Sequence, residues 1–215
     1  MNLAPGHLTT GAGRRRIYLL RHGTVASAGE DRRYIGVTDL DLDESGRQQA
    51  RFWADRFAGA GLEAVYCSPL SRCRETARII GDRCGLVPAA LPALGEINLG
   101  AWEGRRMKTI RTLYPGEYVR RGQAMADFRP PGGESFGDLQ RRAWPAFEEL
   151  AARHRGAILA VTHAGVIRVL LCRLLEMPLD RLFRIGQAHG ALTIIDSGND
   201  GLRLEALNLP SAQTD

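Results

Sequence analysis

The sequence predicts an α/β fold, a three-layer α/β/α sandwich with a mostly parallel central sheet and an antiparallel edge strand. Short apolar runs typical of buried strands alternate with amphipathic helical patterns through most of the 215 residues. Near the end of the chain, residues 191–196 and 202–207 read as two strands joined by a turn, which is typical of an antiparallel pair. No repeat or boundary interrupts the pattern, so we expect one domain at residues 17–209, a loose tail at residues 1–16 and a short tail at residues 210–215.

The first elements are expected to be a strand, a loop, a helix and then a second strand and helix. The apolar run 17–20 predicts a buried strand, and the polar stretch 24–41 after it is too long for a plain connection, which favours a functional loop. Asp43 is placed to cap a helix over residues 43–57. Residues 64–67 predict a short strand, and Ser-Pro is expected to open a helix over residues 68–84, as cap and first turn.

The middle of the chain loses its regular pattern. Gly and Pro break residues 94–131 into short pieces, and we expect this region, above all residues 105–131, to cover a site. Residues 135–153 then predict a helix that begins with a capping box, Asp138 replacing the usual Glu. Residues 158–161 predict another buried strand, and the nearly all-apolar helix at residues 166–175 should be buried.

Composition and charge exclude several classes of protein. The net charge of +5 comes almost wholly from arginine, since Lys108 is the only lysine, and acidic residues are interleaved with the basic ones. This pattern favours anionic ligands but lacks the basic arm of a nucleic-acid binder, so we expect no nucleic-acid partner. No apolar stretch approaches the roughly 20 residues of a membrane span, and residues 1–16 lack the apolar core of a signal peptide. We therefore expect a cytoplasmic protein with no membrane partner, either a monomer or a homodimer.

The cysteine pattern points neither to a disulfide scaffold nor to a metal centre. The spacing lacks C-x-x-C, and no compact cluster of His, Cys and Asp has metal-ligand spacing, so we expect reduced, mostly buried thiols and no metal or other cofactor. The four cysteines are Cys67, Cys73, Cys84 and Cys172.

Two histidines follow two predicted strands. Arg21-His22-Gly23 comes directly after the strand at residues 17–20, and Thr162-His163 comes directly after the strand at residues 158–161. Because ligands of open α/β sheets bind beyond the carboxyl ends of the strands, the two imidazoles could converge there. A neutral imidazole is a competent nucleophile, and an adjacent guanidinium suits phosphate oxygens. Taken alone, His22 is more simply a hydrogen-bonded histidine at a strand end.

A further arginine and two acids extend this candidate site. Arg72 and Arg74 stand near a predicted helix start, where anions bind, but two positions apart on a helix they cannot share a face, so at most one should point inward. Arg72 fits that role better. Glu96 and Glu103 lie in a Gly-rich segment where one could serve as a general acid, although surface carboxylates are the simpler interpretation of each alone.

These elements together resemble the histidine phosphatase superfamily, which includes cofactor-dependent phosphoglycerate mutases and many small phosphatases. Their order and spacing match over about residues 17–209. The matching segments are Leu20-Arg21-His22-Gly23, Ser68-Pro69-Leu70-Ser71-Arg72 with Glu75-Thr76-Ala77, Gly95-Glu96-Ile97 with Gly100-Ala101-Trp102-Glu103-Gly104, and Val161-Thr162-His163-Ala164-Gly165-Val166-Ile167-Arg168.

The resemblance implies a role for each catalytic candidate. His22 becomes the nucleophile that forms a phosphohistidine, Arg21, Arg72 and His163 hold the transferred phosphoryl group, and Glu96 donates the leaving-group proton. Chemically, His22 must be neutral to attack, His163 is more useful when charged, and Glu96 must keep a proton near neutrality.

The resemblance also implies further binding residues, although the chain departs from the family at one binding position. It extends the substrate-binding set to Thr24, Ile35, Gly36 and Gly165. The chain departs from the family where Thr24-Val25 follows His-Gly, because the usual hydroxyl position holds valine; Thr24 or Ser27 could replace the missing contact.

Several features favour a phosphatase acting on a small-molecule phosphate ester. Residues 99–104 resemble the phosphatase branch rather than the Tyr-Gly-Gly-Leu type of the mutases, and residues 33–39 with 131–136 look most like the α-ribazole phosphatase group. The alternatives are a phosphoglycerate mutase and a non-catalytic phospho-ligand or RNA-binding protein. Finally, the arginines of the cover could grip a second anionic group, although a solvated position is favoured; these are Arg105, Arg106 and Arg111.

Overall fold

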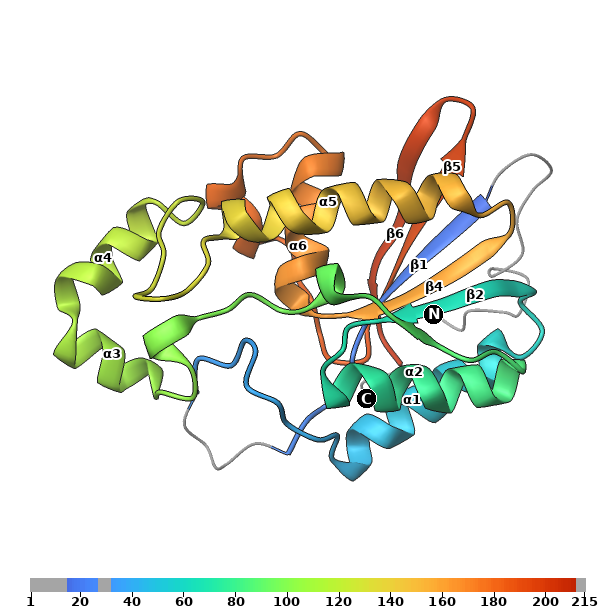
Figure 1. The fold of residues 1–215 in the computed structure, drawn as a ribbon, viewed down its shortest axis with the longest axis horizontal. Coiled ribbons are helices and arrows are strands. Elements are labelled where there is room, and N and C mark those ends of the chain that lie inside the picture. The colour runs from blue at the N-terminus through green and yellow to red at the C-terminus, as the bar shows by residue number, and fades with distance from the viewer. Residues whose placement is uncertain (1–14, 27–31, 212–215) are drawn as a thin grey trace.

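The computed structural model describes residues 15–26 and 32–211, and it confirms the predicted three-layer α/β/α sandwich (Figure 1). A six-stranded sheet in the order β3-β2-β4-β1-β5-β6 forms the middle layer. Its strands are β1 (Arg15–Arg21), β2 (Leu62–Cys67), β3 (Ala89–Ala90), β4 (Ala157–Thr162), β5 (Leu192–Gly198) and β6 (Gly201–Leu209).

Six α-helices and three short 3-10 helices are found among the described residues. The α-helices are α1 (Glu44–Phe57), α2 (Ser71–Cys84), α3 (Met107–Leu113), α4 (Pro115–Gln123), α5 (Phe136–Arg153) and α6 (Ala164–Leu174). The 3-10 helices are η2 (Pro92–Leu94), η3 (Gly100–Trp102) and η4 (Leu179–Arg184). No helix of the described segments is both long enough and apolar enough to cross a membrane.

The N-terminal boundary of the domain differs from the expected one. The tail was expected to reach Arg16, but β1 already begins at Arg15, which lies opposite Ser197 of β5. Arg16 lies opposite Asp196 and forms an ion pair with it at 3.3 Å, so this charge pair extends the strand. Residues 1–14, 27–31 and 212–215, which include most of both expected tails and Ser27, lie outside the described residues.

The two central strands deliver the two candidate histidines to one edge of the sheet. β1 pairs with β4 in parallel, with Arg21 opposite Thr162. The next residues, His22 and His163, therefore leave the sheet together, as expected for the carboxyl ends of parallel strands. On its other side β1 pairs with β5 in antiparallel orientation, and β5 pairs likewise with the edge strand β6.

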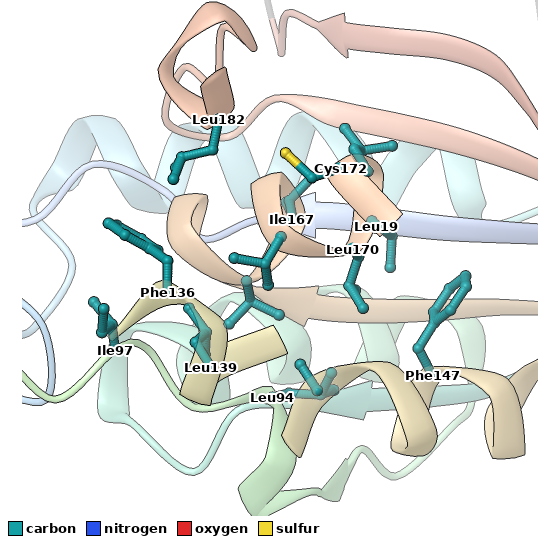
Figure 2. Packing of buried hydrophobic residues seen from close by; sticks show 14 of the residues in the cluster. Leu19, Leu94, Ile97, Phe136, Leu139, Phe147, Ile167, Leu170, Cys172 and Leu182 are labelled. Carbon is teal, nitrogen blue, oxygen red and sulfur yellow. The ribbon is translucent and has the colours of Figure 1, made fainter. Parts of the chain in front are cut away.

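Alternating side chains of β1 build the core on both faces of the sheet. Ile17 and Leu19 belong to the cluster formed with α5 and α6, whereas Tyr18 and Leu20 belong to the cluster formed with α1 and α2. Figure 2 shows the first cluster, in which Leu19 lies among side chains of α5 and α6. Each fully buried large apolar side chain contributes about 1.5–3 kcal/mol, so this double packing fixes the strand that carries His22.

Two of the predicted helix caps are confirmed and one is wrong. The Asp43 side chain accepts a hydrogen bond from the Gly46 N–H at 2.7 Å, and Ser135 with Asp138 forms the capping box of α5. Ser68 does not cap α2, which begins at Ser71. The Ser68 hydroxyl instead lies 2.8 Å from the ring of His163, a contact that the sequence pattern did not reveal.

The predicted cover region forms two short helices, α3 and α4, set apart from the layered body (Figure 1). The Tyr34 N–H donates to the Arg105 carbonyl at 2.9 Å, and the Arg121 guanidinium lies 5.4 Å from the centre of the Tyr34 ring, so the cover contacts the loop after β1. The expectation of solvated cover arginines is confirmed, because all three are exposed; they are Arg105, Arg106 and Arg111.

Candidate active site

His22 is held at the end of β1 as a neutral imidazole with one nitrogen committed. Its backbone N–H donates to the Thr162 carbonyl at 3.0 Å, and its Nδ1 lies 2.8 Å from the Gly23 carbonyl oxygen. A carbonyl only accepts, so Nδ1 carries the proton and Nε2 keeps a free lone pair. Burial, reinforced by the positive charges of Arg21 and Arg72, holds the pKa of His22 well below its ordinary value. The geometry therefore leaves Nε2 as a nucleophilic atom.

His163 faces His22 from the end of β4. The two ring centroids are 5.1 Å apart, and the His163 ring is fully buried. Its Nε2 lies 2.8 Å from Ser68 Oγ and 3.4 Å from Cys73 Sγ. Burial, together with the neighbouring His22 and Arg72, lowers the pKa of His163 well below its ordinary value. Without a bound anion this lowered pKa favours the neutral ring, and a charged His163 during the reaction stays a prediction.

Arg21 places a positive charge next to the histidines of the site. Nη1 donates to the Gln187 carbonyl at 2.5 Å, and Nη2 lies 2.7 Å from His189 Nε2. Its buried Nε has no acceptor among the residues that the structure describes. Burial lowers the pKa of Arg21 to about 10, so the side chain remains cationic at neutral pH. A cation with a buried free donor can accept an anionic ligand.

His189 is a member of the site that the sequence reasoning missed. Its ring centroid lies 5.4 Å from that of His22, and burial next to Arg21 lowers its pKa to about 4. The neutral Nε2 can therefore accept the hydrogen bond from Arg21. A signal was present, since His189-Gly190 lies one residue before β5, and His22-Gly23 is likewise a His-Gly pair next to a strand, β1.

Arg72 is held in the site by hydrogen bonds to the loop after Tyr34. Its side chain is buried while that of Arg74 is exposed, which confirms that only one of the two points inward. Nη1 donates to the Thr38 carbonyl at 2.8 Å and Nη2 donates to the Gly36 carbonyl at 2.7 Å. Each of these nitrogens retains a second N–H, so the guanidinium can hold the loop and still present donors to a ligand.

Glu103 has a structural position rather than a catalytic one. Its carboxylate accepts the backbone N–H groups of three successive residues, at 2.9–3.2 Å, and the Thr38 hydroxyl at 2.6 Å. The three donors are Gly36, Val37 and Thr38. Burial favours a raised pKa, but these hydrogen bonds outweigh it and the pKa of Glu103 lies below its ordinary value. Glu103 therefore fixes the loop on which Arg72 rests.

Glu96 lies buried against the N-terminus of α6. Oε2 accepts the Gly165 N–H at 3.0 Å and Oε1 accepts the Ile97 N–H at 2.9 Å. A Cβ on residue 165 would lie 2.3 Å from Oε1, so only glycine allows this approach. Its charge influences Arg21, which places the acid in the same electrostatic neighbourhood. The protonation state of Glu96 during a reaction stays a prediction.

The remaining predicted binding residues occupy different positions. Thr24 donates both its backbone N–H and its hydroxyl to Gln49 Oε1, at 2.9 and 3.2 Å, so its hydroxyl is already paired. Ile35 is half-buried. Gly36 is required by close packing, since a Cβ there would lie 2.0 Å from the Ile97 carbonyl oxygen. A direct contact of these residues and Gly165 with substrate remains a prediction.

Taken together, the side chains around the two histidines include the cations Arg21 and Arg72, and the Glu96 carboxylate acts on Arg21. The two arginines have N–H groups that could bind a tetrahedral anion, and His22 Nε2 could act as a nucleophile, while proton transfer by Glu96 stays a prediction. This combination fits phosphoryl transfer.

A family model described as "Histidine phosphatase superfamily (branch 1)" matches residues 17–210. The chain belongs to that superfamily. Among curated relatives, this member is 34% identical over 186 residues to a probable phosphoglycerate mutase of Yersinia pestis, covering 84% of each chain.

The solved structures similar to this superfamily member include phosphatases. It is similar to a mycobacterial glucosyl-3-phosphoglycerate phosphatase, at a TM-score of 0.81 and 28% identity over 91% of this chain and 99% of that one. It is also similar to an α-ribazole phosphatase of Shigella flexneri, at a TM-score of 0.81 and 27% identity over 90% of this chain and 96% of that one.

Proposed function

We propose that the protein is a phosphatase that hydrolyses small-molecule phosphate monoesters through a phosphohistidine on His22. The observation that carries the proposal is the state of His22, a buried neutral imidazole whose Nδ1 is bound to the Gly23 carbonyl, leaving Nε2 as a base among cationic groups. Uncatalysed monoester hydrolysis is so slow that enzymes must lower its barrier by up to about 28 kcal/mol, so nucleophile, cations and acid have to act together.

The proposed reaction has two steps. In the first, His22 Nε2 attacks phosphorus in line, a P–N bond forms, the P–O bond to the leaving group breaks, and Glu96 gives its proton to the departing oxygen. In the second, water attacks the phosphohistidine, Glu96 takes a proton from that water, and the P–N bond breaks to release inorganic phosphate. Arg21, Arg72 and His163 stabilise the charge on the transferred group in both steps.

Turnover of p-nitrophenyl phosphate by His22→Ala tests this proposal. We expect kcat to fall by at least about a thousandfold, because the nucleophile is lost. Denaturing the wild-type protein with labelled substrate at alkaline pH should give phosphate on His22 that is stable to base and lost in acid. Wild-type turnover by His22→Ala would overturn the proposal.

A mutase is the second candidate, favoured by the identity to the Yersinia protein. It predicts conversion of 3-phosphoglycerate to 2-phosphoglycerate, stimulated by the bisphosphate and in excess over phosphate release. One coupled assay that follows both products distinguishes the two functions. A non-catalytic RNA-binding protein predicts no turnover and an affinity that falls steeply with salt.

The substrate proposal is a small metabolite, and α-ribazole 5'-phosphate is the first compound to assay. It is supported by the motif resemblance and by the similar α-ribazole phosphatase structure. Glucosyl-3-phosphoglycerate is the second compound to assay, because a glucosyl-3-phosphoglycerate phosphatase is also among the similar structures. The highest kcat/KM identifies the preferred leaving group. We further propose that the protein acts in the cytoplasm without a metal ion, as a monomer or homodimer.

A further inference from the structure

We propose that Arg142 of α5 is a positioning residue for Glu96 and thereby controls proton delivery to the leaving group. The inference rests on the proposed function, in which Glu96 is the general acid. The hydrogen bonds of Arg142 go to the backbone of the acid's own segment and to Glu134, while its charge also helps to lower the pKa of His163.

The Arg142 guanidinium holds the segment that carries Glu96 from one side. Nη2 donates to the carbonyl oxygen of Glu96 itself at 2.9 Å, and Nη1 donates to the Ala93 carbonyl at 3.0 Å. These bonds run from a long, capped helix to the short 3-10 helix η2, which contains Ala93, and to Glu96 in the segment after it, which belongs to no helix or strand. The position of the acid's backbone is therefore set by α5.

Glu134 completes the hold from the other side. Its carboxylate forms a bidentate ion pair with Arg142. Arg142 Nε donates to Glu134 Oε1 at 2.8 Å, and Arg142 Nη2 donates to Glu134 Oε2 at 3.0 Å. Oε2 also accepts the Asn98 N–H at 2.9 Å, and the Glu134 N–H donates to the Asn98 carbonyl at 2.7 Å. One ion pair thus fixes the chain both at Glu96 and two residues after it.

Apolar packing gives this arrangement a rigid base. Leu94 and Ile97, on either side of Glu96, are buried in the same cluster as Phe136 and Leu139 of α5. Figure 2 shows these four side chains gathered beside one another. With the backbone held by α5, the Glu96 carboxylate reaches the Gly165 N–H at the start of α6. Glu96 is therefore bound through its backbone to α5 and through its carboxylate to α6, and both helices pack in the core.

The chemistry requires arginine at position 142. Its planar fork serves two backbone carbonyls and both carboxylate oxygens at once, which a lysine ammonium cannot do. Displacement of a catalytic group by about 1 Å can cost roughly a hundredfold in rate. We therefore expect Arg142→Lys, which keeps the charge, to impair the step that needs a proton.

The test compares leaving groups. Nitrophenolate departs as a stable anion and needs little protonation, whereas an alkoxide needs a full proton transfer. For Arg142→Lys we expect kcat/KM on alkyl phosphates to fall at least about tenfold more than on p-nitrophenyl phosphate, so that log kcat/KM against leaving-group pKa becomes steeper. Arg141→Lys is the matched control, because Arg141 is the exposed neighbour on α5 that pairs with Asp138. It should leave the slope unchanged.

Glu96→Gln separates this inference from the proposed function. This substitution should make the dependence of log kcat/KM on leaving-group pKa steeper still. Adding Arg142→Lys to it should have little further effect, because both substitutions impair the same proton transfer. An unchanged slope for Glu96→Gln overturns the acid in the proposed function. A steep slope for Glu96→Gln with parallel losses for Arg142→Lys overturns only the positioning role. If Arg142→Lys does not fold, Glu134→Gln can replace it, because it weakens the same ion pair. The same steeper slope would then support the positioning role, and parallel losses would overturn it.

Discussion

The imidazole rings of His22 and His163 lie 5.1 Å apart at an angle of 63°, each at the end of one of two adjacent parallel strands. Both rings are buried, and burial among arginines keeps both pKa values low. The pair is therefore neutral before an anion arrives. One ring can act as a nucleophile while the other becomes a proton acceptor once negative charge enters the site.

Binding of a dianion should draw a proton onto His163. Negative charge beside the ring offsets the cost of burying the imidazolium, so the pKa of His163 rises on binding. We expect net proton uptake when sulfate, which does not titrate near neutrality, binds at pH 7. Calorimetry in buffers of different ionisation enthalpy measures it, and His163→Gln should abolish it. A binding enthalpy independent of the buffer in the wild-type protein would contradict the prediction.

Stability should fall as the pH is lowered from about 6.5. The pKa values of three histidines are lower in the folded protein than the ordinary value of 6.5, and for His189 the folded value is about 4. Between these limits the unfolded chain binds protons that the folded chain does not, so the free energy of unfolding decreases as the pH falls.

Urea unfolding at pH 7.5, 6 and 5 measures this dependence. His189→Gln removes one of the three groups and should flatten the slope of the free energy of unfolding against pH, even if it lowers stability at every pH. Equal slopes for the two proteins would show that His189 is not involved.

Gly165→Ala should slow catalysis without unfolding the protein. The added Cβ would lie 2.3 Å from Glu96 Oε1, so the carboxylate must move. A shift of about 1 Å predicts a loss of roughly ten- to a hundredfold in kcat/KM on alkyl phosphates. Gly122→Ala in α4 is the control, because a Cβ there meets nothing within 4 Å. Equal activity of the two variants would contradict the contact.

Glu103→Gln should loosen the loop under Arg72. The substitution turns one acceptor oxygen into a donor that faces N–H groups, and loss of a charged hydrogen bond costs about 1.5–3 kcal/mol. We expect a lower Tm and weaker binding of inorganic phosphate, since Arg72 donates to the carbonyls of Gly36 and Thr38. Glu148→Gln, at an exposed position of α5, should change neither. A Tm loss with unchanged phosphate affinity would separate the loop from ligand binding.

The fold and the placement of the histidines follow from local patterns. Strand periodicity located β1 and β4, and the rule for parallel strands put His22 and His163 at one edge. His189 was missed because it follows an irregular segment with no periodic pattern. Ser68 was read as a cap because a serine before a proline fits that role locally, whereas its partner His163 is distant in sequence. The ties from Arg142 to the Glu96 segment likewise exist only after α5 packs against that segment.

The central place of β1 has a consequence for biosynthesis. The strand that carries His22 lies between β4 and β5, and β5 is made after all the residues of the candidate site. Arg21 depends on the same late region, through Gln187 and His189. Pairings between distant parts of a chain form slowly. A nascent chain on the ribosome should therefore have no competent centre until β5 has emerged, so the onset of activity would report that the sheet around β1 is complete.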